Sequence, residues 1–171
     1  QLEGFCLKLG IETVHELREK LKFERQRVTQ NYHPYDFFNF VVTAWHLHHD
    51  WIKYDKQHRP SLFYKKANQS PPQMKELINA MRDLANGSKH FILDKASEEK
   101  KVVTSVHEPE IRDHFTYVFG PQPGISVCNA YYSVGELVYI VDEYFEWLFD
   151  DLIPADSFPE NLHKILMARV Q

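Results

Sequence analysis

The spacing of hydrophobic residues changes twice along this 171-residue chain, and this change is the strongest constraint on its fold. Over about 11–90, and again over 134–152, apolar side chains recur every three or four positions, which is typical of helices that bury one face. Over about 91–133 the apolar runs are short, β-branched and aromatic, which favours strands. The sequence therefore predicts an α+β fold, mainly α, with a four-helix core and a small antiparallel β-hairpin or sheet inserted before the last long helix.

Four long helices are expected to build the core. Each carries an apolar face, and two of them begin beside prolines, which are well tolerated in the first turn of a helix. The segment between the second and third helices is expected to be a loop, and a short helix is expected to close the chain. The expected helices are 11–30, 34–54, 72–90, 134–152 and the short one at 159–169, with the loop at 55–71.

The strand-forming segment contains one clear turn signal. The link GPQPG at 120–124 has the composition of a turn, which places the best-defined hairpin at 113–133. No internal repeat or low-complexity tract divides the chain, so we expect residues 1–171 to form a single domain.

Charge is distributed unevenly along the chain. The formal net charge of −4 excludes a globally basic nucleic-acid binder, but it does not exclude a local basic patch. The segment 56–75 contains five lysine or arginine residues and no acid, whereas 142–151 contains five acids and no base. The acidic segment is expected to be a solvated helix face, or a docking surface for a basic partner or a second copy.

Cysteine content and hydropathy indicate the compartment. The two cysteines, Cys6 and Cys128, are too far apart for a zinc-binding pair, and a reduced compartment is the simpler interpretation. No run of 18 apolar residues and no signal-peptide pattern occurs, so we expect a cytoplasmic protein without a membrane segment. The glycine-rich motifs of nucleotide cofactor sites are missing, and we expect no cofactor.

Two of the expected helices carry polar side chains along one edge. These side chains follow the i, i+4, i+7, i+11 spacing that keeps them on one face of an α-helix. Such a row either forms a site or braces the bundle, and a shared site requires the two rows to meet in one cleft. The first row is Asn39, Thr43, His46, Asp50 and Lys53, and the second is Asn79, Asp83, Asn86 and His90.

The run HLHHDW offers histidine and carboxylate groups with two alternative uses. His46 and Asp50 are one helical turn apart and His49 adjoins Asp50, so these three are candidate ligands for zinc, manganese or iron. The alternative is a hydrogen bond between His46 and Asp50 at the rim of the bundle. His48 points into the apolar arc of the same helix, where we expect a neutral, hydrogen-bonded core histidine.

The run RDLANGSKH suggests phosphate chemistry. Arg82, Lys89 and His90 are candidates to surround a phosphate, with Asp83 and Asn86 orienting the histidine. Histidine acts as a general acid or base near neutral pH, and a cation stabilises the charge of a phosphorane. The alternative is ordinary capping of a helix C-terminus, where Lys89 and His90 also interact favourably with the helix dipole.

The Arg-to-His segment at the end of a helix resembles the motif of the HEPN superfamily, which includes RNA-cutting toxins, defence proteins and non-catalytic relatives. In that motif four to six residues separate an arginine from a histidine, whereas seven separate Arg82 from His90. The strings HLHHDW and DLANGSKH are also similar to those of small uncharacterised bacterial proteins. The resemblance covers about 34–90 and extends to the last long helix, and it implies a helical protein that binds or cleaves RNA.

The resemblance implies a role for each polar group. His90 would be the acid and base of a metal-independent RNA cleavage, and Arg82 or Lys89 would contact the phosphate. His46 and Asp50 would position the substrate from across the bundle.

The basic loop would hold single-stranded RNA by phosphate contacts and base stacking. Its candidate substrate-binding residues are Arg59, Phe63, Lys65 and Lys66, with Tyr64 beside them. Two other interpretations stay open. One is a non-catalytic interaction module whose polar rows brace the bundle or a homodimer, and the other is a helical-bundle metal-binding protein that uses His46, His49 and Asp50.

Overall fold

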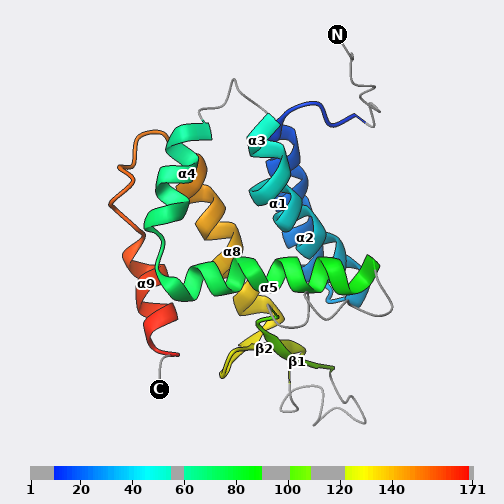
Figure 1. Cartoon of the computed structure of the whole chain (residues 1–171). Helices are drawn as coiled ribbons and strands as arrows, with labels where there is room; N and C mark the ends of the chain where they lie inside the picture. Colours follow the sequence, from blue (N-terminus) through cyan, green and yellow to red (C-terminus); the bar gives the residue numbers. More distant parts are fainter. Residues whose placement is uncertain (1–9, 55–59, 90–100, 109–121, 170–171) are drawn as a thin grey trace.

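The computed structural model describes residues 10–54, 60–89, 101–108 and 122–169 (Figure 1). In these residues a small antiparallel sheet stands between helices in the chain, which confirms the mainly helical α+β fold with the sheet inserted before the last long helix. The elements are α1 (Val14–Gln30), α2 (Pro34–His46), the π-helix η1 (Leu47–Trp51), α3 (Ile52–Tyr54), α4 (Pro60–Gln69), α5 (Pro72–Lys89), β1 (Val103–His107), β2 (Gly124–Val127), β3 (Ala130–Ser133), α8 (Val134–Phe149) and α9 (Glu160–Met167).

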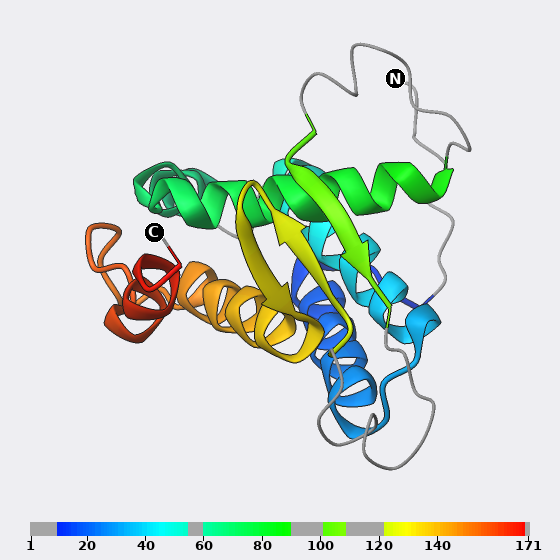
Figure 2. The ribbon, with the colours of Figure 1, turned by 90° about the horizontal axis from the view of Figure 1, so that it is seen from below.

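The hydrophobic core lies where α1, α2, α5 and α8 meet. In Figure 1, α5 runs across the other helices of the bundle, and the sheet lies on the side of α5 away from α4 and α3. Figure 2 shows from below that the strands lie against α5 and α8. No helix among the described segments is long and apolar enough to cross a lipid bilayer. The central side chains are fully buried, and they include Leu21, Phe40, Met81, Leu137 and Ile140.

A capping box defines the start of α1. The Thr13 hydroxyl accepts a hydrogen bond from the Glu16 backbone N–H at 3.1 Å, and the Glu16 carboxylate accepts one from the Thr13 N–H at 2.9 Å. The backbone N–H groups of Glu12 and Thr13 both donate to this carboxylate and lower the pKa of Glu16. These bonds satisfy donors that have no partner within a helix, so α1 begins at Val14 and not at residue 11 as predicted.

The sheet has the strand order β1-β2-β3, and both strand pairs are antiparallel. The hairpin of β2 and β3 turns at Cys128 and Asn129, where Cys128 adopts a φ of 53°. The predicted turn at 120–124 is wrong at its last residue, because β2 begins at Gly124. A Cβ atom at Gly124 would collide with the Tyr132 carbonyl oxygen, so this glycine permits a close approach of two strands. The apolar run at 115–119 lies outside the described residues.

Two features of the helices differ from the prediction. The predicted helix 34–54 is a continuous run, but it changes to π-helical hydrogen bonding over η1. The expected loop at 55–71 contains α4, which the sequence did not indicate. The inward face of α4 includes a lysine, Lys66, whose ammonium donates hydrogen bonds to the carbonyl oxygens of Trp147 at 2.7 Å and Asp150 at 2.5 Å. Because a charged residue occupies a core position, the apolar period of this helix is broken.

A buried cluster of ions joins α1 to α8. The Asp142 carboxylate is 1% exposed and forms ion pairs with Arg18, at 2.6 Å, and with Arg25. Arg18, which is also buried, makes a second ion pair with Glu146 at 2.9 Å. The expectation that the acidic segment 142–151 is a solvated face is therefore wrong for Asp142, which points into the helix interface.

Candidate functional site

The two predicted rows of polar side chains contact different neighbours. From the first row, Thr43 accepts a hydrogen bond from the Lys20 ammonium of α1 at 2.6 Å. From the second row, Asp83 accepts hydrogen bonds from the backbone N–H groups of Val102, at 2.6 Å, and Val103, at 3.4 Å, where the chain enters β1. Thr43 and Asp83 therefore brace two separate contacts within the fold and do not line one shared cleft.

Two residues of the predicted phosphate site, Arg82 and Asp83, form hydrogen bonds with other groups of the protein. Arg82 donates hydrogen bonds to the Asp83 carboxylate at 2.8 Å and to the Asn79 side chain at 3.3 Å. Asn86 is half-buried one turn further along α5. His90 and the side chain of Lys89 lie outside the described part of the chain, so the predicted Arg–His pairing stays a prediction.

His46 and Asp50 form the hydrogen bond that the sequence offered as an alternative to metal binding. The Nδ1 atom of His46 lies 2.8 Å from an Asp50 carboxylate oxygen, and both side chains are partly exposed. His49 approaches the other Asp50 oxygen only to 3.9 Å. Among the described residues no group of three or more histidine, cysteine, aspartate or glutamate side chains is placed to hold a metal ion, which argues against the metal interpretation.

The predicted RNA-binding residues of the basic segment differ in their exposure to solvent. Lys65 is exposed on α4, whereas Phe63 is buried in the core. Lys66 is completely buried, and its ammonium is held by the backbone carbonyls at the end of α8, so it is not available to a phosphate. Arg59 lies outside the described residues.

Substitution of Asp83 by alanine is expected to lower the free energy of unfolding by about 1–3 kcal/mol. The substitution removes the acceptor for two backbone donors at the start of β1 and the partner of Arg82. Urea unfolding followed by circular dichroism measures the change. Asn86→Ala, from the same row, is the matched control and should change stability by less than about 0.5 kcal/mol. Equal effects of the two substitutions would contradict the bracing role of Asp83.

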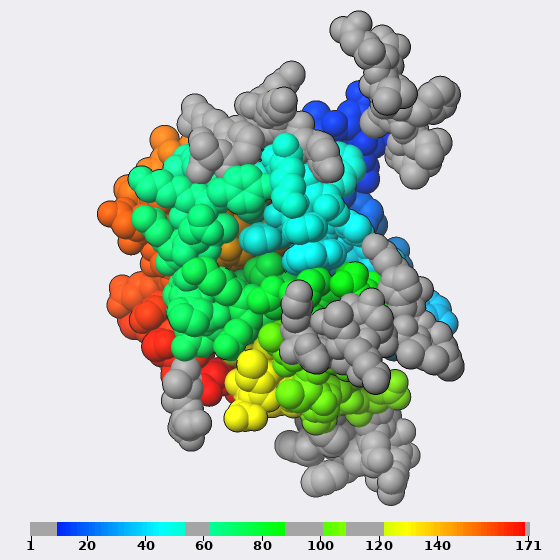
Figure 3. Space-filling view, in the orientation of Figure 1, coloured from blue at the N-terminus to red at the C-terminus, as the bar shows by residue number. Residues whose placement is uncertain are grey.

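A cavity of about 350 Å³ lies between η1, α4 and α5, with α8 at its base. In the space-filling view, a hollow is visible between α4 and the η1–α3 segment, and α8 is seen at its floor (Figure 3). This cavity is called the aromatic pocket below, because half of its lining residues have rings. Its lining residues are Trp45, His48, His49, Tyr64, Ala67, Asn68, Lys75, Ile78, Asn79 and Tyr144.

The helical run from α2 into η1 directs three rings into the aromatic pocket. Trp45, His48 and His49 are spaced i, i+3 and i+4, so they share one helix face. The rings of Trp45 and His49 are stacked, with centroids 4.6 Å apart and planes inclined by 10°. The His48 ring packs against Tyr144 of α8 at 6.1 Å. Single π-helical turns within α-helices are frequent at functional sites, and η1 lies at this pocket.

Two buried polar atoms at the aromatic pocket have no hydrogen-bond partner among the described residues. They are the Nε2 atom of His48 and the hydroxyl oxygen of Tyr64. Burial lowers the pKa of His48 to about 4, so its ring is neutral at pH 7, and burial raises the pKa of Tyr64. The lowered pKa agrees with the predicted neutral histidine, but the residue as a whole is half-buried, and Nε2 has no hydrogen-bond partner among the described residues. Among the buried side-chain atoms of the described residues that have no hydrogen-bond partner, these two are the ones on residues that line this pocket.

Sequence reasoning found part of this pocket. His48, His49 and Asn79 were singled out, but for separate roles. Lys75 and Tyr144 are not identifiable as site residues from the sequence, because nothing in their local sequence indicates that α5 and α8 bring them together. The spacing of Trp45, His48 and His49 was the available signal. No protein-family model, curated protein or solved structure matches this chain, so the resemblance to HEPN domains also stays a prediction.

Proposed function

We propose that the protein binds single-stranded RNA by inserting a nucleobase into the aromatic pocket. The observation that carries the proposal is the pair of unpartnered, buried polar atoms, His48 Nε2 and the Tyr64 hydroxyl, on two residues that line a cavity walled by rings. The volume of about 350 Å³ is at the small end of the range of about 300–1,000 Å³ typical of ligand pockets. A planar heterocycle with donors and acceptors on its edge fits this chemistry.

Stacking supplies the sequence-independent part of the binding. The exposed His49 ring and the half-buried Trp45 ring already form a stack at the pocket wall. A base can be added to this stack without a rearrangement of the two rings. Stacking of a base on an aromatic side chain contributes about 1–3 kcal/mol. A neutral His48 and the Tyr64 hydroxyl are each able to hydrogen-bond to the edge of the inserted base.

The charge around the aromatic pocket suits a phosphate backbone. Among the described residues that line it there is no acid, and Lys75 of α5 stands at its edge, exposed, with its ammonium donating to the Asn68 carbonyl at 2.6 Å. Lys65 is exposed on the neighbouring α4. The acids that produce the net negative charge include the buried Asp142, whose charge is compensated within the core. Local cations thus favour an anionic ligand despite the overall charge.

RNA binding is compatible with the resemblance to HEPN domains, which include non-catalytic relatives. Cleavage of the bound RNA rests on His90, which lies outside the described residues, and it stays a prediction. The predicted homodimer also stays a prediction.

The decisive experiment measures fluorescence anisotropy of a labelled single-stranded oligoribonucleotide with the wild-type protein and with Tyr64→Phe. The substitution removes only the unpartnered hydroxyl, so it should leave stability unchanged or slightly increased. We expect it to weaken RNA binding about tenfold, the loss of roughly one hydrogen bond. Lys75→Ala should weaken binding and reduce the salt dependence by about one counterion.

Tyr35→Phe is the matched control, because Tyr35 is 75% exposed and distant from the pocket lining. It should bind RNA as the wild type does. Failure of the wild-type protein to bind RNA saturably at low salt would refute the proposal, and so would equal affinities for the wild type and Tyr64→Phe. If an unlabelled mononucleotide displaces the labelled RNA as effectively as unlabelled RNA does, the ligand is a free nucleotide and the RNA proposal is wrong.

A further inference from the structure

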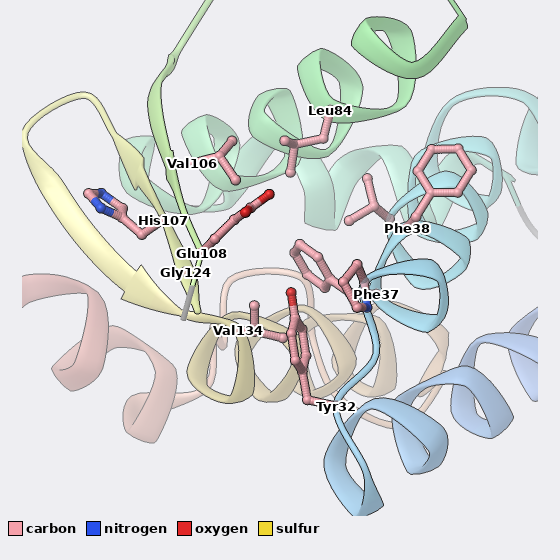
Figure 4. A pocket seen from close by; sticks show the side chains of 11 residues that line it. Tyr32, Phe37, Phe38, Leu84, Val106, His107, Glu108, Gly124 and Val134 are labelled. Carbon is pink, nitrogen blue, oxygen red and sulfur yellow. The ribbon is translucent and has the colours of Figure 1, made fainter. Parts of the chain in front are cut away.

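A second and larger cavity, of about 530 Å³, lies where the sheet meets the bundle. It shares no lining residue with the aromatic pocket. Its wall comes from the start of α2, from α5, from the end of β1 and from the first residue of α8 (Figure 4). We call it the sheet-side pocket. A ligand of this cavity would therefore occupy a site separate from the aromatic pocket.

The lining of the sheet-side pocket is mostly apolar and is not fully buried by the fold. Val106 is 61% exposed and Phe38 is 40% exposed, although both line the same cavity as the buried Val41. Figure 4 shows the rings of Tyr32 and Phe37 side by side at one wall, opposite Val106. Three aromatic rings and several aliphatic side chains thus offer an apolar surface to a small ligand.

One acidic residue, the exposed Glu108, is among the residues that line this mostly apolar pocket. The Glu108 carboxylate is directed into the space between Leu84, Val106 and Phe37 (Figure 4). Among the described residues, no lysine, arginine or histidine forms an ion pair with it. Of the described lining residues, the other ionisable side chain directed into the pocket is Tyr32, because the His107 ring points away from it and contacts Ser105 and Ser126. Burial raises the pKa of the Tyr32 hydroxyl, and Glu108 adds to this increase, so Tyr32 stays neutral.

We propose that the sheet-side pocket binds a small organic cation, an ammonium group attached to an apolar body. Glu108 supplies the opposite charge, and the faces of Tyr32 and Phe37 attract a cation through their ring quadrupoles. The apolar body lies against Leu84 and Val106. An anionic ligand is disfavoured by the carboxylate, and a neutral one uses only the apolar wall.

The test compares three probes of nearly the same shape, namely 2-phenylethylammonium, 2-phenylethanol and 3-phenylpropionate. Their dissociation constants are measured by titration calorimetry or by NMR chemical-shift changes. We expect the ammonium probe to bind at least fivefold more tightly than the alcohol, and the carboxylate probe to bind weakest. Glu108→Gln should remove most of the ammonium preference and leave alcohol binding unchanged. Val106→Lys, at an exposed position, should block the ammonium probe by placing an internal cation beside Glu108.

Glu160→Gln is the matched control, because Glu160 is an exposed acid on α9 and lies outside the pocket lining. It should bind all three probes as the wild type does. The proposal is overturned if the alcohol binds as tightly as the ammonium probe, if Glu108→Gln retains the ammonium preference, or if no probe binds. RNA binding by Glu108→Gln should equal that of the wild type, which separates this inference from the proposed function.

Discussion

Replacing Asp142 with alanine is expected to lower the free energy of unfolding by about 3–5 kcal/mol, enough to remove much of the stability of a typical domain. The carboxylate is almost completely buried between α1 and α8, where it compensates Arg18 and Arg25. Without it, the partners that the buried Arg18 guanidinium keeps among the described residues are the half-exposed Glu146 carboxylate, the Asp142 backbone carbonyl and the face of Phe145. Breaking a buried pair from one side is costly because an uncompensated charge remains in a medium of low polarity.

Thermal and urea unfolding measure this effect. For a chain of this length, each kcal/mol corresponds to about 2–4 °C in Tm, so a decrease of roughly 10 °C is expected. Glu160→Ala is the control, because it breaks an exposed ion pair with Lys164 and should cost less than about 1 kcal/mol. The double variant Arg18→Met/Asp142→Leu should be more stable than Asp142→Ala, because it also removes the buried positive charge of Arg18. A double variant that is less stable would contradict the charge-compensation argument.

Acidification is expected to destabilise the protein through His48. The pKa of this histidine is about 4 in the folded protein, against an ordinary value of 6.5, so the unfolded chain binds more protons between these values. The contribution of the neutral ring is therefore complete above about pH 6.5 and is lost as the pH falls toward 4. The expected loss at pH 5 is about 2 kcal/mol relative to a residue that does not titrate.

The measurement compares wild-type protein with His48→Phe in urea unfolding at pH 7 and at pH 5. Carboxylates titrate in both proteins, so only the difference between their pH dependences reports on His48. The wild type should lose about 2 kcal/mol more than the variant over this interval. Equal losses would mean that the His48 ring is not held neutral by burial, and they would remove the basis for treating it as an unpaired acceptor or donor in the aromatic pocket.

The sequence predicted the fold class because the hydrophobic period carries that information directly. The helical runs and the β-branched insertion are evident from the local sequence, whereas the start of α1 was predicted at residue 11 and the Thr13 cap was not recognised. α4 was missed because Lys66 occupies a core position, and a buried lysine is recognisable only once its carbonyl partners on α8 are known. The hairpin turn was misplaced because Gly124 resembles a turn residue, although it serves close strand packing.

The candidate site was less predictable than the fold. Polar side chains at helical spacing indicate that they share one face of a helix. They do not indicate which other segment of the protein packs against that face. Thr43 and Asp83 turned out to contact α1 and the start of β1. The aromatic pocket depends on side chains from four separate segments, and its two unpartnered atoms become visible only when burial is known. Local patterns therefore identified His48 as unusual, whereas the pocket around it required the three-dimensional structure.

The Lys66 ammonium ties α4, one wall of the aromatic pocket, to the end of α8. α4 carries Tyr64 and Ala67 on the side of the pocket, while Lys66 fastens the same helix to the last carbonyls of α8. Movement of α4 away from the pocket would have to break both hydrogen bonds of the Lys66 ammonium at once. The charged ammonium would then be buried without a partner until water reached it, which is energetically costly. Any widening of the aromatic pocket on the α4 side would therefore have to break the Lys66 hydrogen bonds, and we expect the rate of ligand release to depend on this side chain, which does not line the pocket.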